Sequence, residues 1–460
     1  MLFNSLAFLL FLPIVFVVYW SGRSMQWQNR TVVLASMFFY GWWDWRFLLL
    51  MVATCVANFY IAKAVARTDI QRQRKHWLLL AICLNIGLLA VFKYFNFFAD
   101  NLAMLFSLFG VKLDVPTLHI ILPIGISFYT FQLTAYVVDV YRRQLQACRS
   151  LEMFLSFICF FPQLVAGPIE RGSNLLPQFA KKRMFDYTFA TDGMRLFLWG
   201  LMKKMLVADN CAPVADYVFG NYQSLAMVDL WIGLLAFTIQ VYCDFSGYSD
   251  MAIGSAKLFG VQLSTNFNHP FFATTIREFW RRWHMTLMGW LRDYVYFPLG
   301  GSRCSAVRHY FNVFALYMLS GLWHGPNWSF IAWGTWNGFF NVTTKHLRMS
   351  VALSWFVTIM AFTLSQVFFR NPTVTDGFRF FGGLFSFDGV WANTASRIPL
   401  VLAVMLFGIE YLTRNHAHPF QFSGRGLWRW RLARYVIYAV CFIGCVMLGG
   451  QQVQFIYFQF

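Results

Sequence analysis

Long apolar stretches alternate with short polar loops along the whole chain. A transmembrane helix needs about 20 consecutive apolar residues, so shorter windows are expected to tilt, merge or re-enter the membrane. Apolar windows lie near residues 2–20, 31–43, 46–64, 77–92, 119–137, 151–167, 191–207, 230–252, 308–323, 327–344, 352–369, 399–413 and 434–450. This pattern predicts an all-α integral membrane protein with about ten to twelve transmembrane helices and additional re-entrant or interfacial helices.

The composition supports a membrane location for these windows. Hydrophobic residues make up 58% of the chain, aromatic residues 20% and charged residues only 12%, whereas about 25% of the residues in a typical soluble domain are charged. The first window has the length of a secretion signal, but it lacks a basic start, contains Pro13 and ends in Tyr19 and Trp20. Such an aromatic pair suits the membrane interface, so we interpret this window as a transmembrane helix.

Basic residues are scattered over many short loops and give a formal net charge of +18. Cytoplasmic loops of membrane proteins are enriched in Lys and Arg. The basic residues that follow the first and third windows are Arg23, Arg30, Lys63, Arg67, Arg72, Arg74 and Lys75. Both loops are therefore expected to face the cytoplasm, with the amino terminus outside. Because the charge is not concentrated in one domain, we expect the lipid bilayer as its partner and no nucleic acid.

The chain shows no linker, low-complexity segment or clear internal repeat, which predicts one continuous membrane domain over residues 1–460. The apolar pattern breaks over residues 238–304, where charges, prolines and glycines stand among aromatic residues. Irregular backbone at membrane depth is tolerated only where protein or a water-filled cavity surrounds it. We therefore expect this segment to line a cavity, which the proline-interrupted residues 161–179 either line or brace.

The sequence does not indicate metal or disulfide chemistry. The nine cysteines lie mostly inside apolar stretches, and the closest pair, Cys441 and Cys445, matches neither a redox pair nor a zinc site. Asp244 and Asp250 in "DFSGYSD" fit no calcium loop, and we expect them to cap helix ends and to form hydrogen bonds inside the fold. The serines between them lack the strand-turn-helix setting of a hydrolase nucleophile. We predict no metal site.

The segment "REFWRRWH" carries a basic stripe. In a continuous helix Arg277, Arg281 and His284 fall on one face, and Glu278 and Arg282 form a four-residue pair. The arginine forks suit the phosphates of a nucleotide-based donor. The same residues also fit an interfacial helix whose arginines reach lipid head groups and whose histidine is structural. Spacing alone leaves both interpretations open.

The segment "GLWHGPNW" places His324 where two apolar windows meet. Ionisable groups inside membrane segments are costly and usually face an interior pathway. Gly321 and Gly325 permit close approach of a substrate or of backbone. Apolar walls are expected from Trp323, Trp328, Trp333 and Trp336. A dry pocket would keep the imidazole neutral near pH 7, as a general base requires. The alternative is a histidine bonded to a carbonyl freed near Pro326.

Five segments together resemble one known family. They are "PIGISFYTFQLTAYVVDVYR", "FPQLVAGPIER", "DFSGYSDMAIG", "FWRRWHMTLMGWLRDYVYFPLGG" and "GLWHGPNWSFIAWG". The chain resembles the membrane-bound O-acyltransferases, in particular the bacterial branch of alginate O-acetylation and teichoic acid D-alanylation. The resemblance implies a ring of helices around a central tunnel, with His324 as the catalytic residue and His284 as a second functional residue at the tunnel. The chain departs from a "WGxxHG" pattern of many relatives, because Asn337 replaces a histidine and cannot serve as a base.

The resemblance predicts an O-acetyltransferase in the bacterial cytoplasmic (inner) membrane. We expect no bound cofactor and a cytoplasmic acetyl thioester, acetyl-CoA, as the donor substrate. The residues predicted to bind it are Arg277, Arg281, Arg282, Trp323 and Asn337. His284, Asn337 or a freed main-chain N–H would stabilise the oxyanion.

The acceptor is expected to be a polysaccharide, such as alginate or another envelope polymer, or a hydroxyl on an extracytoplasmic acetyltransferase partner protein. A transporter or export channel without its own catalysis is the alternative, although such proteins often show internal symmetry that this chain lacks. A scaffold for an envelope synthase is a third possibility, and it would not need His324.

Overall fold

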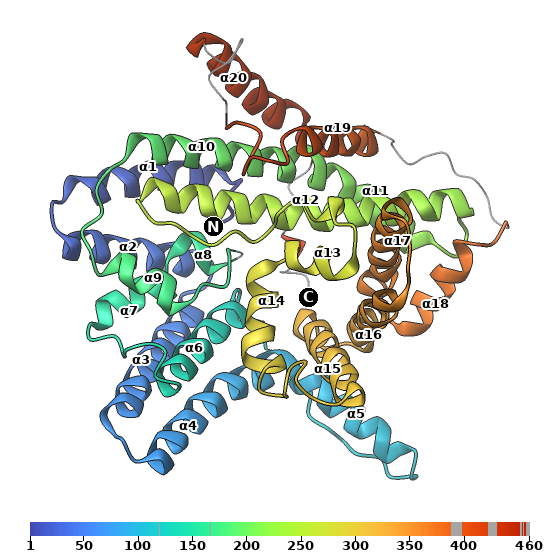
Figure 1. Ribbon diagram of the computed structural model, residues 1–460, viewed down its shortest axis with the longest axis horizontal. Coiled ribbons are helices and arrows are strands. Elements are labelled where there is room, and N and C mark those ends of the chain that lie inside the picture. The colour runs from blue at the N-terminus through green and yellow to red at the C-terminus, as the bar shows by residue number, and fades with distance from the viewer. Residues whose placement is uncertain are drawn as a thin grey trace. The chain divides into compact units, whose positions relative to one another are not determined.

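The computed structural model describes residues 1–118, 120–165, 167–387, 398–421, 430–450, 453 and 455–456. Within these residues the regular structure consists of helices alone, which confirms the predicted all-α class. The chain forms two compact units, drawn together in Figure 1. The first unit comprises Met1–Asp186 and Phe259–Leu263, and the second comprises Tyr187–Leu258 and Ser264–Phe460. Each unit is described separately.

The helices of the first unit follow the predicted apolar windows. They are α1 (Leu6–Ser21), α2 (Met25–Gly41), α3 (Trp45–Arg67), α4 (Gln71–Leu89), α5 (Phe95–Ser107), α6 (Ile126–Tyr141), α7 (Leu151–Ile158), α8 (Phe161–Leu164) and α9 (Gly172–Phe179). Polar side chains fix several of the starts. Ser5, Ser24 and Asp44 each accept a main-chain N–H in the first turn of α1, α2 and α3, which satisfies a donor that has no partner within the helix.

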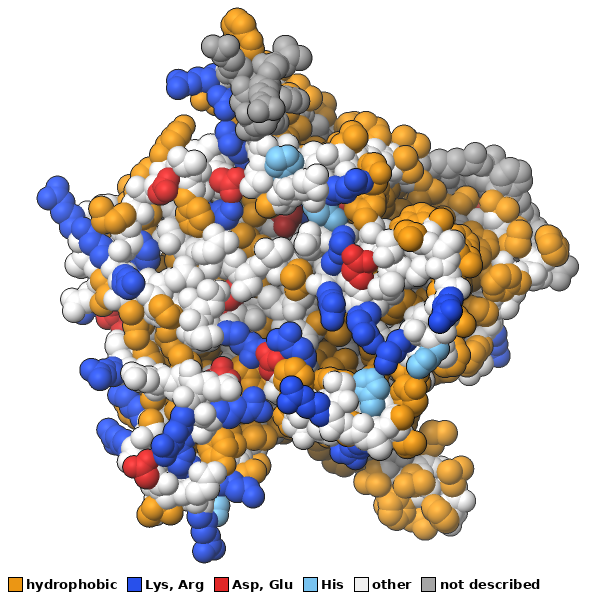
Figure 2. Space-filling model, viewed as in Figure 1, with side chains coloured by type: hydrophobic (Ala, Val, Ile, Leu, Met, Phe, Trp, Pro, Cys, Tyr) orange, Lys and Arg blue, Asp and Glu red, His pale blue; other side chains and the backbone are white. Residues whose placement is uncertain are grey.

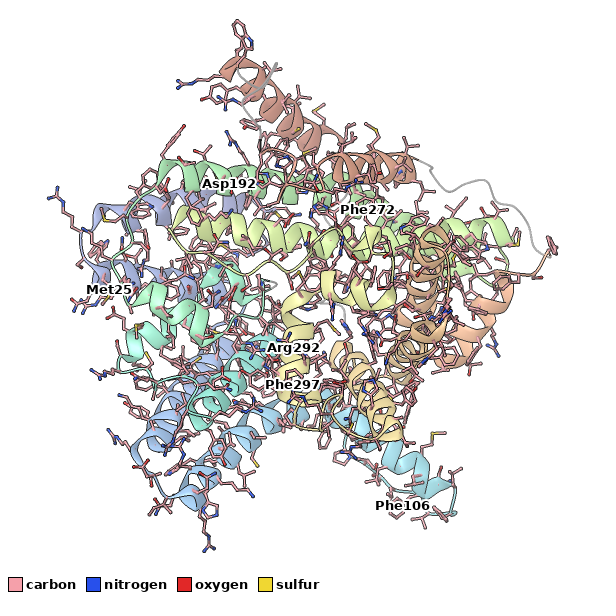
Figure 3. The ribbon with its side chains drawn as sticks, in the orientation of Figure 1. Met25, Phe106, Asp192, Phe272, Arg292 and Phe297 are labelled. Carbon is pink, nitrogen blue, oxygen red and sulfur yellow. The ribbon has the colours of Figure 1, made fainter. Side chains whose placement is uncertain are left out.

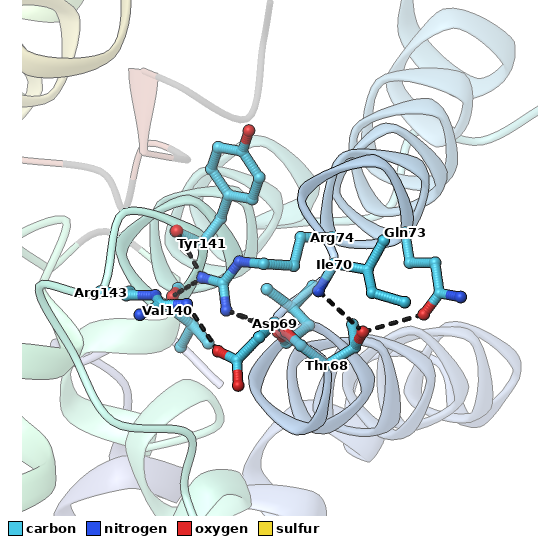
Figure 4. A network of polar contacts seen from close by, with 9 residues as sticks. Thr68, Asp69, Ile70, Gln73, Arg74, Val140, Tyr141 and Arg143 are labelled. Atoms are coloured by element: carbon cyan, nitrogen blue, oxygen red, sulfur yellow. Dashed lines mark hydrogen bonds and ion pairs between the residues drawn. The ribbon is translucent and has the colours of Figure 1, made fainter.

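A buried arginine ties three helices of the first unit together (Figure 4). The guanidinium of Arg74, on α4, donates to the carbonyl of Val65 at 3.1 Å and to that of Tyr141 at 2.7 Å. These carbonyls belong to the last turns of α3 and α6, where helix carbonyls lack intrahelical donors and attract positive charge. Arg74, which the sequence assigned to a cytoplasmic loop, is therefore also a buried structural residue.

The second unit contains the remaining helices (Figure 1). They are α10 (Tyr187–Met202), α11 (Asp209–Asn221), α12 (Met227–Leu258), α13 (Ile276–Arg282), α14 (Met285–Leu291), α15 (Ala306–His324), α16 (Trp328–Thr343), α17 (Val351–Arg370), α18 (Val374–Gly383), α19 (Ile398–Leu412) and α20 (Arg431–Leu448). Glycines bring α10 and α12 into close contact. A Cβ added at Gly200 would lie 2.5 Å from the carbonyl oxygen of Gly247, and one at Gly254 would lie 2.5 Å from that of Gly193. Small residues at such crossings let two helix backbones approach.

Buried ion pairs link α12 to the π-helical turn η2 (Lys203–Ala208). Lys203 Nζ lies 2.6 Å from a carboxylate oxygen of Asp250, and Lys204 Nζ lies 2.7 Å from Asp209 and 2.8 Å from Asp244. Asp244 and Asp250 were expected to cap helix ends, and this prediction is wrong, because both lie inside the continuous helix α12. Lys203 and Lys204 pair with these carboxylates, and the helix therefore continues through residue 238, where the apolar pattern of the sequence changes.

The same ion cluster binds main-chain groups near the carboxyl end of the described chain. Lys204 Nζ donates to the carbonyl of Val453 at 3.0 Å, and the N–H of Ile456 donates to Asp244 at 2.8 Å. Charged groups removed from water need such additional hydrogen bonds to offset their desolvation. The cluster therefore holds three segments of the second unit in place.

Five described helices are long and apolar enough to cross a membrane: Trp45–Arg67, Gln71–Ser107, Met227–Leu258, Val351–Arg370 and Arg431–Leu448. Two shorter apolar helices, Leu6–Ser21 and Pro399–Leu412, add to them. About ten to twelve spans were expected from the apolar windows. Several of the other windows form short helices, as at residues 151–167, where α7 and α8 replace one long element.

Candidate active site

His324 ends helix α15 in the interior of the second unit. The next residue, Gly325, is extended, and Asn327 caps the start of α16 by accepting the N–H of Ser329. Only 5% of His324 is exposed. Its ring centroid lies 4.9 Å from that of Trp323, 5.1 Å from that of Trp333 and 5.1 Å from that of Phe369. The imidazole therefore sits in a box of aromatic rings.

The two glycines that flank His324 accommodate protein atoms. A Cβ at Gly321 would collide with the carbonyl of Phe330, and one at Gly325 would collide with the ring of Phe330. These glycines thus allow α15 and α16 to pack tightly around the histidine. Of the expected tryptophan walls, Trp328 is exposed, and Trp336 donates its indole N–H to the carbonyl of Ala361.

His284 lies just after the basic helix α13, in a left-handed conformation with φ 43°. The expected stripe of Arg277, Arg281 and His284 is therefore broken, because α13 ends at Arg282 and the chain turns before α14 begins. The turn sends His284 into the core, where its ring contacts that of Phe245 at 4.6 Å. The two arginines stay on the helix surface.

The hydrogen bonds around His284 fix the position of its proton. Its Nδ1 lies 3.1 Å from Oδ1 of Asn266, and that oxygen also accepts the main-chain N–H of Thr286. A main-chain N–H can only donate, so this amide atom is an acceptor and His284 Nδ1 carries the hydrogen. The lone pair then resides on Nε2, which has no hydrogen-bond partner within the described ranges. Burial lowers the pKa of His284 to about 3, so the ring is neutral near pH 7.

Trp323 connects the two histidines. Its ring centroid lies 5.8 Å from that of His284 and 4.9 Å from that of His324. Asn337 is also buried, and its amide nitrogen donates to the carbonyl of Trp333 at 2.8 Å, one helical turn earlier. The structure thus brings four of the sequence-predicted residues into one buried aromatic region of the second unit.

A basic cavity of about 550 Å³ opens beside this region. Its positively charged lining residues are Arg277, Arg281, Arg292 and Lys345, and no carboxylate lines it among the residues that the structure describes. Lys and Arg side chains gather on this face in Figure 2, over the region of α13, α15 and α16 in Figure 1. Arg292, labelled in Figure 3, starts the turn after α14 and lies near Phe297. Such a cavity favours a ligand with several negative charges.

Arg282 is absent from the lining of this cavity. Its guanidinium donates to the carboxylate of Glu278, as the four-residue spacing predicted. Sequence patterns missed Arg292 and Lys345, because these residues lie in the turn after α14 and in the turn after α16, outside the basic segment. Lys345 directly follows the apolar window 327–344, but nothing local linked that lysine to Arg277.

Two indole rings separate the cavity from His324. Trp280 lines the cavity, and its ring lies 5.7 Å from that of Trp333, which in turn contacts His324. His324 itself is absent from the cavity lining, as is His284. The rings of Trp280 and Trp333 therefore separate a ligand bound in the cavity from the imidazole.

Comparison with known proteins supports the sequence resemblance. The profile of the MBOAT, membrane-bound O-acyltransferase family, matches residues 78–386. The chain is 40% identical over 439 residues to the Probable alginate O-acetylase AlgI of Pseudomonas aeruginosa, covering 92% of this chain and 83% of that protein. It is 36% identical over 430 residues to the Peptidoglycan O-acetyltransferase of Helicobacter pylori, covering 85% and 81%.

A more distant similarity extends to teichoic acid modification. The chain is 27% identical over 289 residues to the Teichoic acid D-alanyltransferase of Bacillus subtilis, covering 58% of this chain and 70% of that protein. The predicted resemblance is confirmed by the family match and by the high identity over most of the chain. The protein is a multi-pass membrane O-acyltransferase that belongs to the membrane-bound O-acyltransferase family.

Proposed function

We propose that this enzyme transfers an acetyl group from a cytoplasmic thioester, acetyl-CoA, toward an envelope or secreted polysaccharide, and that it resides in the bacterial cytoplasmic (inner) membrane. The observation that carries the proposal is a basic cavity, lined by no carboxylate among the described residues, that the rings of Trp280 and Trp333 separate from the buried His324. The relatives named for alginate and peptidoglycan O-acetylation support the choice of acetyl group and polymer class.

The donor binds in the basic cavity through its phosphates. Arg277 and Arg281 face the cavity from one side of α13, and Lys345 faces it from the short 3₁₀ helix η5 (Thr344–His346) that follows α16. A second cavity of about 460 Å³ shares Arg277 and Lys345 with the first and adds Arg348. Arginine forks bind phosphate oxygens through paired hydrogen bonds. Arg282 is not part of this donor site, because its guanidinium donates a hydrogen bond to the carboxylate of Glu278.

His324 acts as the general base. As the accepting hydroxyl oxygen forms a bond to the thioester carbonyl carbon, its proton passes to the neutral imidazole, and the carbonyl electron pair moves onto oxygen. Collapse of this oxyanion breaks the C–S bond, and the sulfur takes the proton from the imidazolium. Burial of His324 among Trp323, Trp333 and Phe369 keeps water from competing with the acceptor.

The indole rings of Trp280 and Trp333 must shift before this reaction. They stand between the donor cavity and His324, so the acetyl group reaches the imidazole only when that layer opens. Such gating steps set the rate of many enzymes. We therefore expect donor binding and chemistry to be separable steps.

The direct acceptor is a hydroxyl of the polymer or of a separate extracytoplasmic acetyltransferase. The test uses the purified chain in lipid vesicles with radiolabelled acetyl-CoA outside and a soluble glycan inside, alone or with a candidate partner protein. Label on the enclosed glycan or partner supports the proposal. Uptake of intact donor without transfer would identify a transporter instead.

A further inference from the structure

The buried face of α16 carries three polar groups at a spacing of four residues. Ser329, Trp333 and Asn337 each have 3% or less of their surface exposed. Residues four apart lie one above the other on a helix, so all three point into the interior that holds His324. The Trp333 ring is the member that contacts both the imidazole and the cavity-lining Trp280.

The indole N–H of Trp333 is a buried donor that finds no acceptor among the residues that the structure describes. Leaving a buried donor without an acceptor costs about 1–3 kcal/mol, and more than 90% of comparable main-chain groups are paired. The neighbouring Trp336 shows the usual arrangement, because its indole N–H donates to the carbonyl of Ala361 at 2.9 Å. An unused donor therefore sits on the path from the donor cavity to His324.

Acyl transfer at this site creates an oxyanion that needs a hydrogen-bond donor. His284 does not meet this need at Nε2, because its hydrogen is on Nδ1 and is given to Asn266. The amide nitrogen of Asn337 already donates to the carbonyl of Trp333. These two residues were the side chains that the sequence suggested for this role. The indole N–H of Trp333 is a further buried donor, and its ring contacts that of His324 at 5.1 Å.

We propose, resting on the acyltransferase function above, that Trp333 is a further catalytic residue whose indole N–H binds the thioester carbonyl oxygen and stabilises the oxyanion. The carbonyl carbon then stands between this N–H and the hydroxyl that His324 deprotonates. The movement of the Trp280 and Trp333 rings that admits the donor also brings the indole N–H of Trp333 to the thioester carbonyl oxygen. Donor entry and oxyanion binding thus depend on the same ring.

The test compares two tryptophans of α16. Trp333→Phe removes an N–H that has no acceptor among the described residues together with part of a packed ring, so we expect a lower thermal unfolding temperature, as for Trp336→Phe, but a fall in kcat of about 100-fold, with KM for acetyl-CoA within twofold. Trp336→Phe removes a structural hydrogen bond, so we expect a lower unfolding temperature and kcat within twofold. Ser329→Ala, which removes a hydroxyl from the same face, is expected to leave kcat within threefold.

Replacement of Trp333 by β-(3-benzothienyl)alanine separates the N–H from the ring shape, because sulfur takes the place of the N–H. The proposal requires this variant to match the loss seen for Trp333→Phe. Retention of at least half of the wild-type kcat by the benzothienyl variant overturns it, as does a larger loss in Ser329→Ala than in either Trp333 variant. If His324→Ala is inactive in that experiment, the proposed function stands while the role of Trp333 falls. Absence of acetyl transfer by the wild type overturns both.

Discussion

Removal of single charges from the donor cavity should separate donor binding from chemistry. Arg277 and Arg281 both line the cavity from α13, one helical turn apart. A hydrogen bond to a charged group contributes about 1.5–3 kcal/mol, and the lower end applies here because arginines at an open cavity stay partly hydrated. Since about 1.4 kcal/mol corresponds to a tenfold change, Arg281→Gln should raise KM for acetyl-CoA about tenfold with kcat within twofold.

The double change of Arg277 and Arg281 to Gln should raise KM by about 10- to 100-fold, because neighbouring charges do not act independently. The effect should shrink as salt is raised from 50 to 500 mM, since screening weakens the remaining cationic groups as well. The assay is acetyl transfer in vesicles, together with direct binding of CoA to the purified protein, which needs no turnover.

Arg282→Gln is the matched control, because Arg282 neighbours Arg281 on the same helix but donates to Glu278 outside the cavity lining. Its KM and its CoA affinity should stay within twofold of the wild type. Equal effects of the Arg281 and Arg282 changes, or an unchanged CoA affinity in the double variant, would refute the assignment of this cavity to the donor. The arginines would then be lipid or structural contacts.

Two further predictions concern stability. Lys204→Met leaves the buried carboxylates of Asp209 and Asp244 without their lysine and should lower the free energy of unfolding by about 3–5 kcal/mol, measured as a lower thermal unfolding temperature. The control Lys182→Met removes an exposed lysine and should leave the unfolding temperature unchanged. Equal effects of the two substitutions would contradict the buried cluster. The pKa of His284 is about 3 in the fold against an ordinary 6.5, so below pH 6.5 the unfolded chain binds a proton that the folded chain excludes. Protonation of this residue in the unfolded chain should lower the free energy of unfolding by roughly 2 kcal/mol between pH 7 and pH 5. In His284→Gln the pH dependence of the free energy of unfolding should be weaker by this amount. A pH dependence equal to that of the wild type would show that the ring is protonated in the fold.

The sequence predicted the helices well because apolarity is a local property. Each apolar window holds part of a helix, and the two histidines both contact Trp323 in one buried region. The helical periodicity of the sequence did not predict where the chain turns between α13 and α14. The basic stripe was drawn as one helix through His284, but a left-handed residue cannot be recognised from spacing, and Asn266, which binds the histidine, lies 18 residues earlier.

Contacts between distant segments account for the other misses. Asp244 and Asp250 look like capping residues when seen alone, because the lysines that pair with them precede them by 40 and 47 residues, on another element. Arg292 and Lys345 join the donor cavity from separate elements, so no motif contains them together with Arg281. Such sets are visible only after the helices have been packed.

We propose that the buried imidazole of His324 carries out acyl transfer. The most direct measurement is acetyl transfer by His324→Ala in vesicles, with membrane insertion and CoA affinity measured on the same preparation. Because a general base contributes about 10²–10⁴-fold, we expect transfer to fall by at least 100-fold while insertion and CoA affinity stay at wild-type values. Full transfer by His324→Ala, above all if His284→Ala abolishes it, would contradict the account.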